Sequence, residues 1–278
     1  MTSRYLSIDL ELPSMASNLR AAGLSASVLQ ELDTRLELQV TGLLRLLERL
    51  GLKATVFAVG QLALSHGQLL DRIRDAGHGI GCHGHSHLNL HRADPARARE
   101  DLQGATTALG PWLPAVGQRG FRAPDFSLDP QDSLFYRALA ENGYRWSSSV
   151  MRARVPSVGN LPLELQLGRV WREPGSGVLE LPLGGHRPFG IPLGHGGGFW
   201  LRVLPLAWSR WNLARDARTG ALPQVYLHPW ELDPDQPRLV RGWRGWRQYH
   251  GQASMETRLE VLCAGMQVLP LEAAAWLD

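Results

Sequence analysis

Short apolar segments alternate with longer amphipathic segments along most of the chain. Residues 5–11 alternate apolar and polar side chains with a period of two, which predicts a strand with Asp9 and Glu11 on one face near its carboxyl end. Further strands are expected at 54–60, 79–82, 144–150, 178–183 and 225–227, with one more ending in residues 120–125. Helices are expected at 36–51, 69–77, 94–110, 129–143, 206–218 and 255–266. This alternation favours parallel strands with crossover helices, that is, an α/β fold.

Local signals place several helix ends. Asp94-Pro95 predicts a helix start, with a capping side chain followed by proline in the first turn. Asp129-Pro130 predicts another start, and residues 34–37 resemble a capping box. A loop is expected from Pro13 onward. No internal repeat or linker is visible, so we expect a single domain over residues 1–278, with 232–278 as its C-terminal extension.

Composition narrows the class of protein. The chain is 44% hydrophobic and 20% charged, as in ordinary globular proteins, and its net charge is only +3 without a basic block, which argues against a nucleic-acid partner. It has no apolar run of transmembrane length, and its first residues do not resemble a signal peptide, so we expect no integral membrane segment and a cytoplasmic location. Most of the ten tryptophans lie in the second half, either in the core or as platforms for sugars.

The segment 82–88 (Cys-His-Gly-His-Ser-His-Leu) holds the densest group of histidines. His83 and His87 are four residues apart, so a turn or a strand end can aim both in one direction, and neutral imidazole is a common metal ligand. A polar loop that happens to be rich in histidine is the alternative. Cys82 is expected to point away into the core, and His85 to support the loop rather than bind metal.

Other reactive residues also fall at the carboxyl ends of predicted strands, which in a parallel barrel form one face. One carboxylate and two imidazoles make a usual three-ligand metal site with an open position for water. A second carboxylate on the same face could take a proton from that water, an arginine could keep it ionised, and a distant histidine could protonate a leaving amine. The residues in question are Asp9, Glu11, His83, His87, Arg122 and His228.

With these residues assembled, the chain resembles the polysaccharide deacetylases, the carbohydrate esterases that share the NodB homology domain. The resemblance covers nearly the whole chain and is strongest toward the deacetylases of exosortase (PEP-CTERM) exopolysaccharide clusters. It is carried by residues 7–11, 83–87, 121–124, 143–150 and 228–238, with 247–249 and 257–259 resembling the C-terminal region of that subgroup.

The resemblance implies a distorted (β/α)7 barrel and a divalent metal ion, most readily zinc, with cobalt, nickel or manganese as alternatives. It also implies hydrolysis of N-acetyl groups on the amino sugars of a polysaccharide or its precursor. By position, Asp9 matches the catalytic base of the family, and Glu11, His83 and His87 match its metal ligands.

The same resemblance assigns the remaining site residues. Arg122 matches the arginine that pairs with the base, and His228 matches the general acid. The backbone N–H of Asp125 falls at the oxyanion position, Leu227 lines the acetyl pocket, and Trp230 is placed with the substrate-binding residues.

The sequence departs from the family pattern in two places. Glu11 stands where the family usually has an aspartate paired directly with the base, and Ser147 replaces another aspartate, which leaves Glu231 as the candidate partner of His228. Two other functions therefore stay open: a small-molecule C–N hydrolase such as an amidase or deformylase, and a non-catalytic glycan-binding relative. An open, aromatic-lined groove would favour a glycan, and a closed pocket a small molecule.

Overall fold

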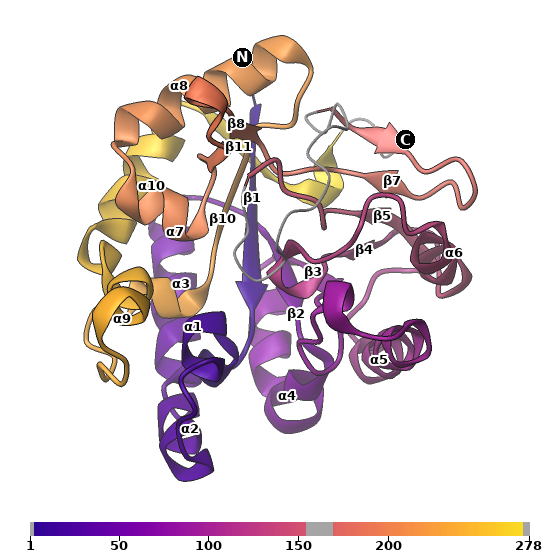
Figure 1. Cartoon of the computed structure of the whole chain (residues 1–278), viewed down its shortest axis with the longest axis horizontal. Coiled ribbons are helices and arrows are strands. Elements are labelled where there is room, and N and C mark those ends of the chain that lie inside the picture. The colour runs from indigo at the N-terminus through magenta and orange to yellow at the C-terminus, as the bar shows by residue number, and fades with distance from the viewer. Residues whose placement is uncertain (1–2, 154–168, 275–278) are drawn as a thin grey trace.

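A computed structural model describes residues 3–153 and 169–274 of the chain. Its centre is a curved sheet, in which parallel strands form a half-barrel (Figure 1). The sheet order is β10-β1-β2-β3-β4-β5-β7-β6, and β11 also pairs with β1. The strands are β1 (Ser3–Leu10), β2 (Thr55–Ala58), β3 (Gly79–Cys82), β4 (Arg119–Phe121), β5 (Tyr144–Ser147), β6 (Trp171–Arg172), β7 (Leu179–Glu180), β10 (Gln224–Leu227) and β11 (Gln267–Pro270). The predicted α/β fold of the NodB barrel type is confirmed.

A side chain on β10 forms hydrogen bonds with the backbone just after β7, across the open part of the half-barrel. Gln224 at the start of β10 donates from Nε2 to the carbonyls of Leu181 and Pro182, at 2.9 and 3.1 Å. In the ladders around the rest of the sheet, β1 pairs in parallel with both β10 and β2, whereas β6 pairs with β7 in the antiparallel sense. A separate two-stranded sheet joins β8 (Gly185–His186) and β9 (Leu193–Gly194).

Helices follow the strands around the sheet (Figure 1). None of the helices in the described part of the chain is long and apolar enough to cross a membrane. The helices are α1 (Ser17–Arg20), α2 (Ala26–Asp33), α3 (Leu36–Arg49), α4 (Gly60–Asp75), α5 (Pro95–Leu109), α6 (Ser133–Glu141), α7 (Gly198–Val203), α8 (Leu206–Thr219), α9 (Gly242–Tyr249) and α10 (Met255–Cys263).

The predicted helix ends were right in part. Asp94 caps α5 and accepts from the Arg97 N–H at 3.0 Å, as expected. The capping box expected at 34–37 is wrong, because Thr34 donates its hydroxyl to the Glu31 carbonyl at 2.7 Å and Arg35 makes no side-chain cap.

Two further helix predictions need correction. The start predicted at Asp129-Pro130 is early by about a turn: α6 begins at Ser133, where Asp132 caps it by accepting from the Phe135 N–H at 3.0 Å. The loop expected after Pro13 contains α2, whose amino-terminal cap is Ser25.

Strand β1 is buried on both faces. Its apolar side, including Leu6 and Ile8, packs with Val40 and other residues of α3 in the main core. Its other side turns Ser7 and Asp9 into the barrel interior. Because buried polar groups need hydrogen-bond partners, Ser7 and Asp9 must belong to a polar network inside the barrel.

Candidate active site

The loops that follow four parallel strands open onto one cavity of about 990 Å³. Its lining includes Asp9 and Glu11 from the end of β1, His83 and His87 after β3, and His228 after β10. The structure therefore brings together residues that are up to 219 positions apart, on the face where the sequence places them. Arg122, the first residue after β4, lies directly behind Asp9.

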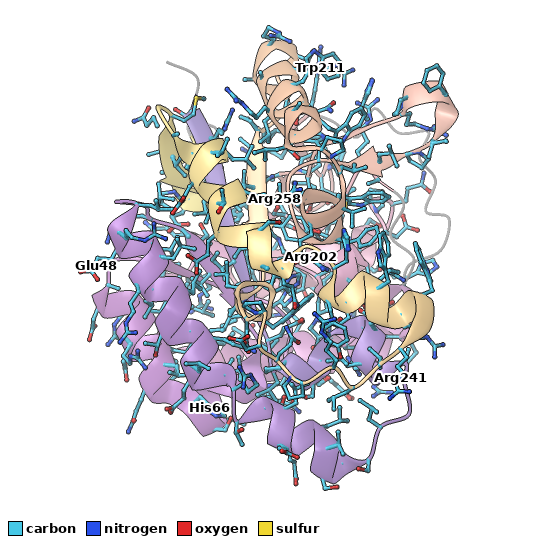
Figure 2. All side chains as sticks on the ribbon, turned by 90° about the vertical axis from the view of Figure 1, so that its left-hand side faces the viewer. Glu48, His66, Arg202, Trp211, Arg241 and Arg258 are labelled. Carbon is cyan, nitrogen blue, oxygen red and sulfur yellow. The ribbon has the colours of Figure 1, made fainter. Side chains whose placement is uncertain are left out.

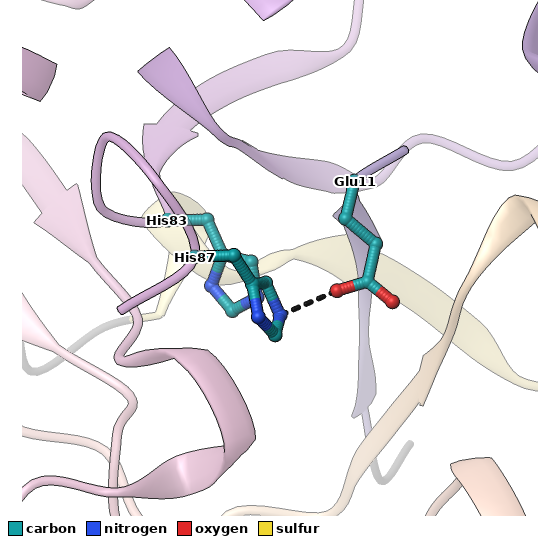
Figure 3. Close-up of side chains that lie close together, drawn as sticks. All are labelled: Glu11, His83 and His87. Carbon is teal, nitrogen blue, oxygen red and sulfur yellow. Dashed lines mark ion pairs between the residues drawn. The ribbon is translucent and has the colours of Figure 1, made fainter. Parts of the chain in front are cut away.

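Glu11, His83 and His87 form a compact buried triad (Figure 3). Their potential ligand atoms all lie within 4.8 Å of one another, and each side chain is almost completely buried. His87 has a φ of 54°, in the left-handed region that non-glycine residues seldom adopt. That turn, which begins at Gly84 with φ of 73°, lets the loop present two histidines to the same point.

Neighbouring groups fix the orientation of each triad residue. His83 donates from Nδ1 to the carbonyl of Arg122 at 2.8 Å, which leaves Nε2 with its lone pair toward the triad. Trp230 donates from its indole N–H to Glu11 Oε1 at 3.1 Å. Arg20 donates to the carbonyl of His87 at 2.9 Å and so holds the turn in place.

Charge and burial make the triad suitable for a cation. Burial alone would raise the pKa of Glu11, but the nearby charge of His87 outweighs it and brings that pKa down to about 2. Burial lowers the pKa of His83 to about 4, so its imidazole is neutral at pH 7. Among the described residues, no donor is aligned on Glu11 Oε2 for a hydrogen bond, although His87 Nε2 lies only 2.5 Å away. A buried, ionised oxygen next to two imidazole nitrogens fits a divalent metal of the zinc type.

Behind the triad, Arg122 holds Asp9. The guanidinium donates from Nη1 to Asp9 Oδ1 at 2.8 Å and to Ser7 Oγ at the same distance. It also donates to the carbonyl and the hydroxyl of Ser148, at 3.0 and 2.9 Å. The ring of Phe57 lies 4.3 Å below the guanidinium carbon. Arg122 is completely buried, so its charge orients and neutralises Asp9 inside the barrel.

His228 lies next to the carboxylates of Asp9 and Glu11. Its Nε2 is 4.0 Å from Asp9 Oδ2 and 4.0 Å from Glu11 Oε1, while its Nδ1 is 3.0 Å from Glu231 Oε2. Burial would lower the pKa of His228, but the hydrogen bond with Glu231 and the charges of Glu11 and Glu231 raise it to about 9. His228 therefore carries a proton at neutral pH in this arrangement.

The partner that the sequence suggested for His228 is the one found in the structure. Glu231 accepts from Arg202 Nε at 2.6 Å through one oxygen and contacts the imidazole through the other. Arg202 was missed from the sequence, because it lies on α7, in a region with no readable strand–helix pattern. Trp230 stacks on the His228 ring at 5.0 Å with an interplanar angle of 26°, which fixes the ring from its open face.

The other predicted site residues differ in their positions. Asp125 lines the cavity with φ of 57°, and its carboxylate accepts from Ser17 and from Asn89. Leu227 is fully buried in the main core and does not line the cavity, in contrast to the acetyl-pocket position predicted for it. Its neighbour Tyr226 lines the cavity instead, because side chains alternate along β10.

The remaining residues of the histidine segment support the loop. Cys82 is buried in the main core, as predicted. His85 does not line the cavity, and its side chain packs against Gly60 and Gly104; a larger residue at Gly60 would collide with it. Asp101, which the sequence did not single out, accepts from the backbone N–H groups of His85 and Ser86 at 2.7 and 3.0 Å. This carboxylate on α5 holds the turn that presents the two histidines of the triad.

Comparison with known proteins supports the class defined by this fold and site. Residues 27–146 match a family model described as polysaccharide deacetylase, and residues 148–274 match a domain of unknown function, DUF3473. No curated protein matches the chain. The first match supports a polysaccharide deacetylase domain of the NodB type, over less than half of the chain. Membership of the exosortase-associated subgroup stays a prediction, because the DUF3473 match only hints at it.

Solved structures show the same fold at low identity. A protein from Mycobacterium smegmatis assigned as a polysaccharide deacetylase superposes with a TM-score of 0.61 at 17% identity, covering 96% of this chain and 86% of the other. One from Pseudomonas aeruginosa with the same assignment gives 0.58 at 16%, covering 96% and 86%. The Puue allantoinase also gives 0.58 at 16%, covering 96% and 85%. Because one of these is an allantoinase, the fold alone does not select a glycan.

Proposed function

We propose that the chain is a metal-dependent hydrolase that removes N-acetyl groups from the amino sugars of a polysaccharide or its precursor. The observation that carries this proposal is the arrangement of two carboxylates and three imidazoles around one point. Glu11, His83 and His87 converge within 4.8 Å, and His228 stands 4.0 Å from both carboxylates. This set supplies a metal site, a base and an acid together.

The chain's own residues divide the chemistry of amide hydrolysis among them. Asp9 accepts a proton from the attacking water, and Arg122 pairs with this carboxylate and aims it into the cavity. Bound by Glu11, His83 and His87, a divalent cation would polarise the acetamide carbonyl and make water more acidic. Zinc suits this donor set best, with cobalt, nickel or manganese as alternatives.

The leaving amine requires a proton, and His228 is placed to donate it. Glu231 accepts from Nδ1 and favours the imidazolium, so the transferable proton sits on Nε2, which faces the carboxylates. Arg202 prevents Glu231 from taking the proton itself, because the ion pair at 2.6 Å stabilises the ionised carboxylate. The expected substrate is an N-acetylated glycan or glycan precursor, and a cytoplasmic location stays a prediction.

The shape of the cavity favours a glycan over a small molecule. A volume of about 990 Å³ reaches well beyond an acetamido group, to aromatic residues on α7 and α9. Phe199, Trp200 and Trp243 belong to this outer part of the lining. Flat aromatic rings suit the apolar faces of pyranose units. An aromatic lining is the feature that the sequence analysis expected for a glycan substrate.

The proposal is tested by metal analysis of the purified protein combined with acetate release from N-acetylated oligosaccharides. We expect about one divalent ion per chain, lost in His83→Ala and His87→Ala, and acetate release that Asp9→Asn reduces at least about 100-fold. Asp71→Asn, at an exposed carboxylate on α4, is the matched control and should keep full activity. A bound ion without acetate release from any oligosaccharide tested would favour the non-catalytic glycan-binding alternative.

A further inference from the structure

The cavity carries a group of basic side chains that take no direct part in the proposed chemistry, although one of them, Arg20, also holds the turn of His87. We call this group the basic rim, and it consists of Arg20 on α1, Arg92 and Arg97 before and within α5, and Arg244 and Arg247 on α9. The helix that carries Arg20, α1, packs against the helix that carries Arg244 and Arg247, α9. Across that contact Asn18 donates to Gln248 at 3.3 Å. The rim thus borders the same opening as the metal centre.

Within the described part of the chain, no guanidinium nitrogen of the basic rim lies within 4.0 Å of a carboxylate oxygen. Some arginines elsewhere are ion-paired, such as Arg35 with Asp233 at 2.7 Å and Arg49 with two glutamates of α10. What distinguishes the basic rim is that its unpaired guanidinium groups gather at one cavity. Of the four acidic residues that line the cavity, Asp9 pairs with Arg122, Glu231 with Arg202, and Glu11 with His87. Only Asp125 has no cationic partner among the residues described, and it stands against five arginines. The cavity opening therefore holds uncompensated positive charge.

This concentration of charge is local. The net charge of the chain is only +3, so the basic rim does not reflect a generally basic surface. Burial lowers the pKa of Arg247, and the nearby charge of Arg202 lowers it further. A cleft lined by one sign of charge attracts ligands of the opposite sign.

An aromatic platform lies beside these arginines. Trp243 is 66% exposed and stacks on Trp246, with ring centroids 4.8 Å apart and an angle of 15°. Trp246 stacks in turn on His250 at 4.9 Å. The Arg247 guanidinium lies 5.6 Å from the Phe199 ring. A large exposed indole at the mouth of a cavity is typical of a surface that a ligand covers.

We propose that the glycan bound here is acidic, with a carboxylate or phosphate group on the basic rim and a sugar ring on Trp243. This inference rests on the proposed function, because it names the substrate class of the same site. A neutral glycan offers hydroxyl groups, which pair well with carboxylates and amides, whereas free guanidinium groups match carboxylate and phosphate in charge and in geometry. The acidic group lies outside the metal centre, on a sugar unit or linkage adjoining the acetylated one.

The test is equilibrium binding by calorimetry, which requires no hydrolysis. The probes are a tetrasaccharide of alternating N-acetylglucosamine and glucuronate, N-acetylglucosamine 1-phosphate, and neutral chitotetraose. We expect one of the acidic probes to bind at least about 10-fold more tightly than chitotetraose, with the difference shrinking as salt is raised. The acidic probe that binds more tightly identifies the group as a carboxylate or a phosphate.

Matched variants separate the basic rim from general charge. Arg244→Gln should weaken binding of the acidic probe by about 5–10-fold and leave chitotetraose unchanged. Arg241→Gln removes the same charge from an exposed residue at the start of α9 that does not line the cavity, and should leave both probes unchanged. Trp243→Ala should weaken both probes, and Trp211→Ala, at an exposed indole on α8 far from Arg241 (Figure 2), should weaken neither.

The outcomes distinguish this inference from the proposed function. Equal binding of neutral and acidic probes, or equal losses in Arg244→Gln and Arg241→Gln, would overturn the acidic-glycan inference. Absence of acetate release from zinc-loaded protein, with tight binding of an acidic probe retained, would overturn the hydrolase and leave the binding site standing. Because Arg244 and Arg241 are both exposed, neither substitution should affect folding.

Discussion

The chain contains two arginine–aspartate pairs of equal length in opposite surroundings. Arg122 Nη1 and Asp9 Oδ1 are 2.8 Å apart, with side chains 0% and 2% exposed. Arg74 Nη2 and Asp71 Oδ1 are also 2.8 Å apart, but their side chains are 48% and 45% exposed on α4. The same substitution in both pairs therefore compares a buried ion pair, with the hydrogen bonds that Arg122 adds to it, with an exposed ion pair.

Arg122→Met keeps an apolar chain of similar length and removes every donor. Asp9 then remains buried without its counter-ion, and Ser148 loses the two hydrogen bonds that Arg122 donates to it. Removing one partner of a buried pair costs about 3–5 kcal/mol of unfolding free energy. Arg74→Met should cost less than about 1 kcal/mol, because water solvates the released carboxylate.

The assay is urea denaturation at pH 7 of both variants and of Arg122→Met combined with Asp9→Asn. If the cost arises from a stranded charge, the double variant should be less destabilised than the sum of the single changes, by about 1–3 kcal/mol. Similar losses below about 1 kcal/mol in Arg122→Met and Arg74→Met, or strict additivity in the double variant, would refute this account of the barrel interior.

Further predictions concern the site and one helix cap. Trp230→Phe keeps a ring stacked on His228 but removes the indole donor to Glu11, so metal affinity measured by competition with a chelator should fall by about 10-fold or more. In metal-free protein, NMR titration should give His228 a pKa of about 9, lowered in Glu231→Gln. Since this pKa lies above the unfolded value near 6.5, its stabilisation of about 3 kcal/mol is complete below pH 6.5 and lost as pH rises through 9. Asp94→Ala should cost about 1 kcal/mol of stability in thermal unfolding, because α5 loses its cap.

Local signals in the sequence predicted much of the fold. The period-two pattern of residues 5–11 identified β1 and the shared face of Asp9 and Glu11, and Asp94 identified the start of α5. These features depend on neighbours in the chain, so spacing and caps reveal them. The cap of α6 was misplaced because both Asp129 and Asp132 precede the helix, and the proline after the first is no stronger a signal than the second aspartate.

Long-range contacts could not be predicted in this way. Gln224 contacts two carbonyls beyond β7, and Asp101 holds the histidine turn from the next helix. Arg202 reaches Glu231 from a segment without a readable pattern. Each of these residues has a common polar side chain, and only the fold determines which distant group it meets. Leu227 illustrates the reverse case, since its alternation with Tyr226 on β10 determines which of the two faces the cavity.

The first and second halves of the chain contribute different residues to the site. This division indicates which half determines specificity for the substrate. The triad and Asp9 come from β1 and β3, whereas His228, Glu231, Arg202 and the aromatic platform on α9 all come from the second half, within the segment matched by DUF3473. Amide hydrolysis requires the first set in nearly any substrate. In the proposed reaction, the second set would protonate the leaving amine and contact the sugar unit that adjoins it. Exchanging residues of α9 should therefore change which glycan is bound, while the metal affinity of the triad stays the same.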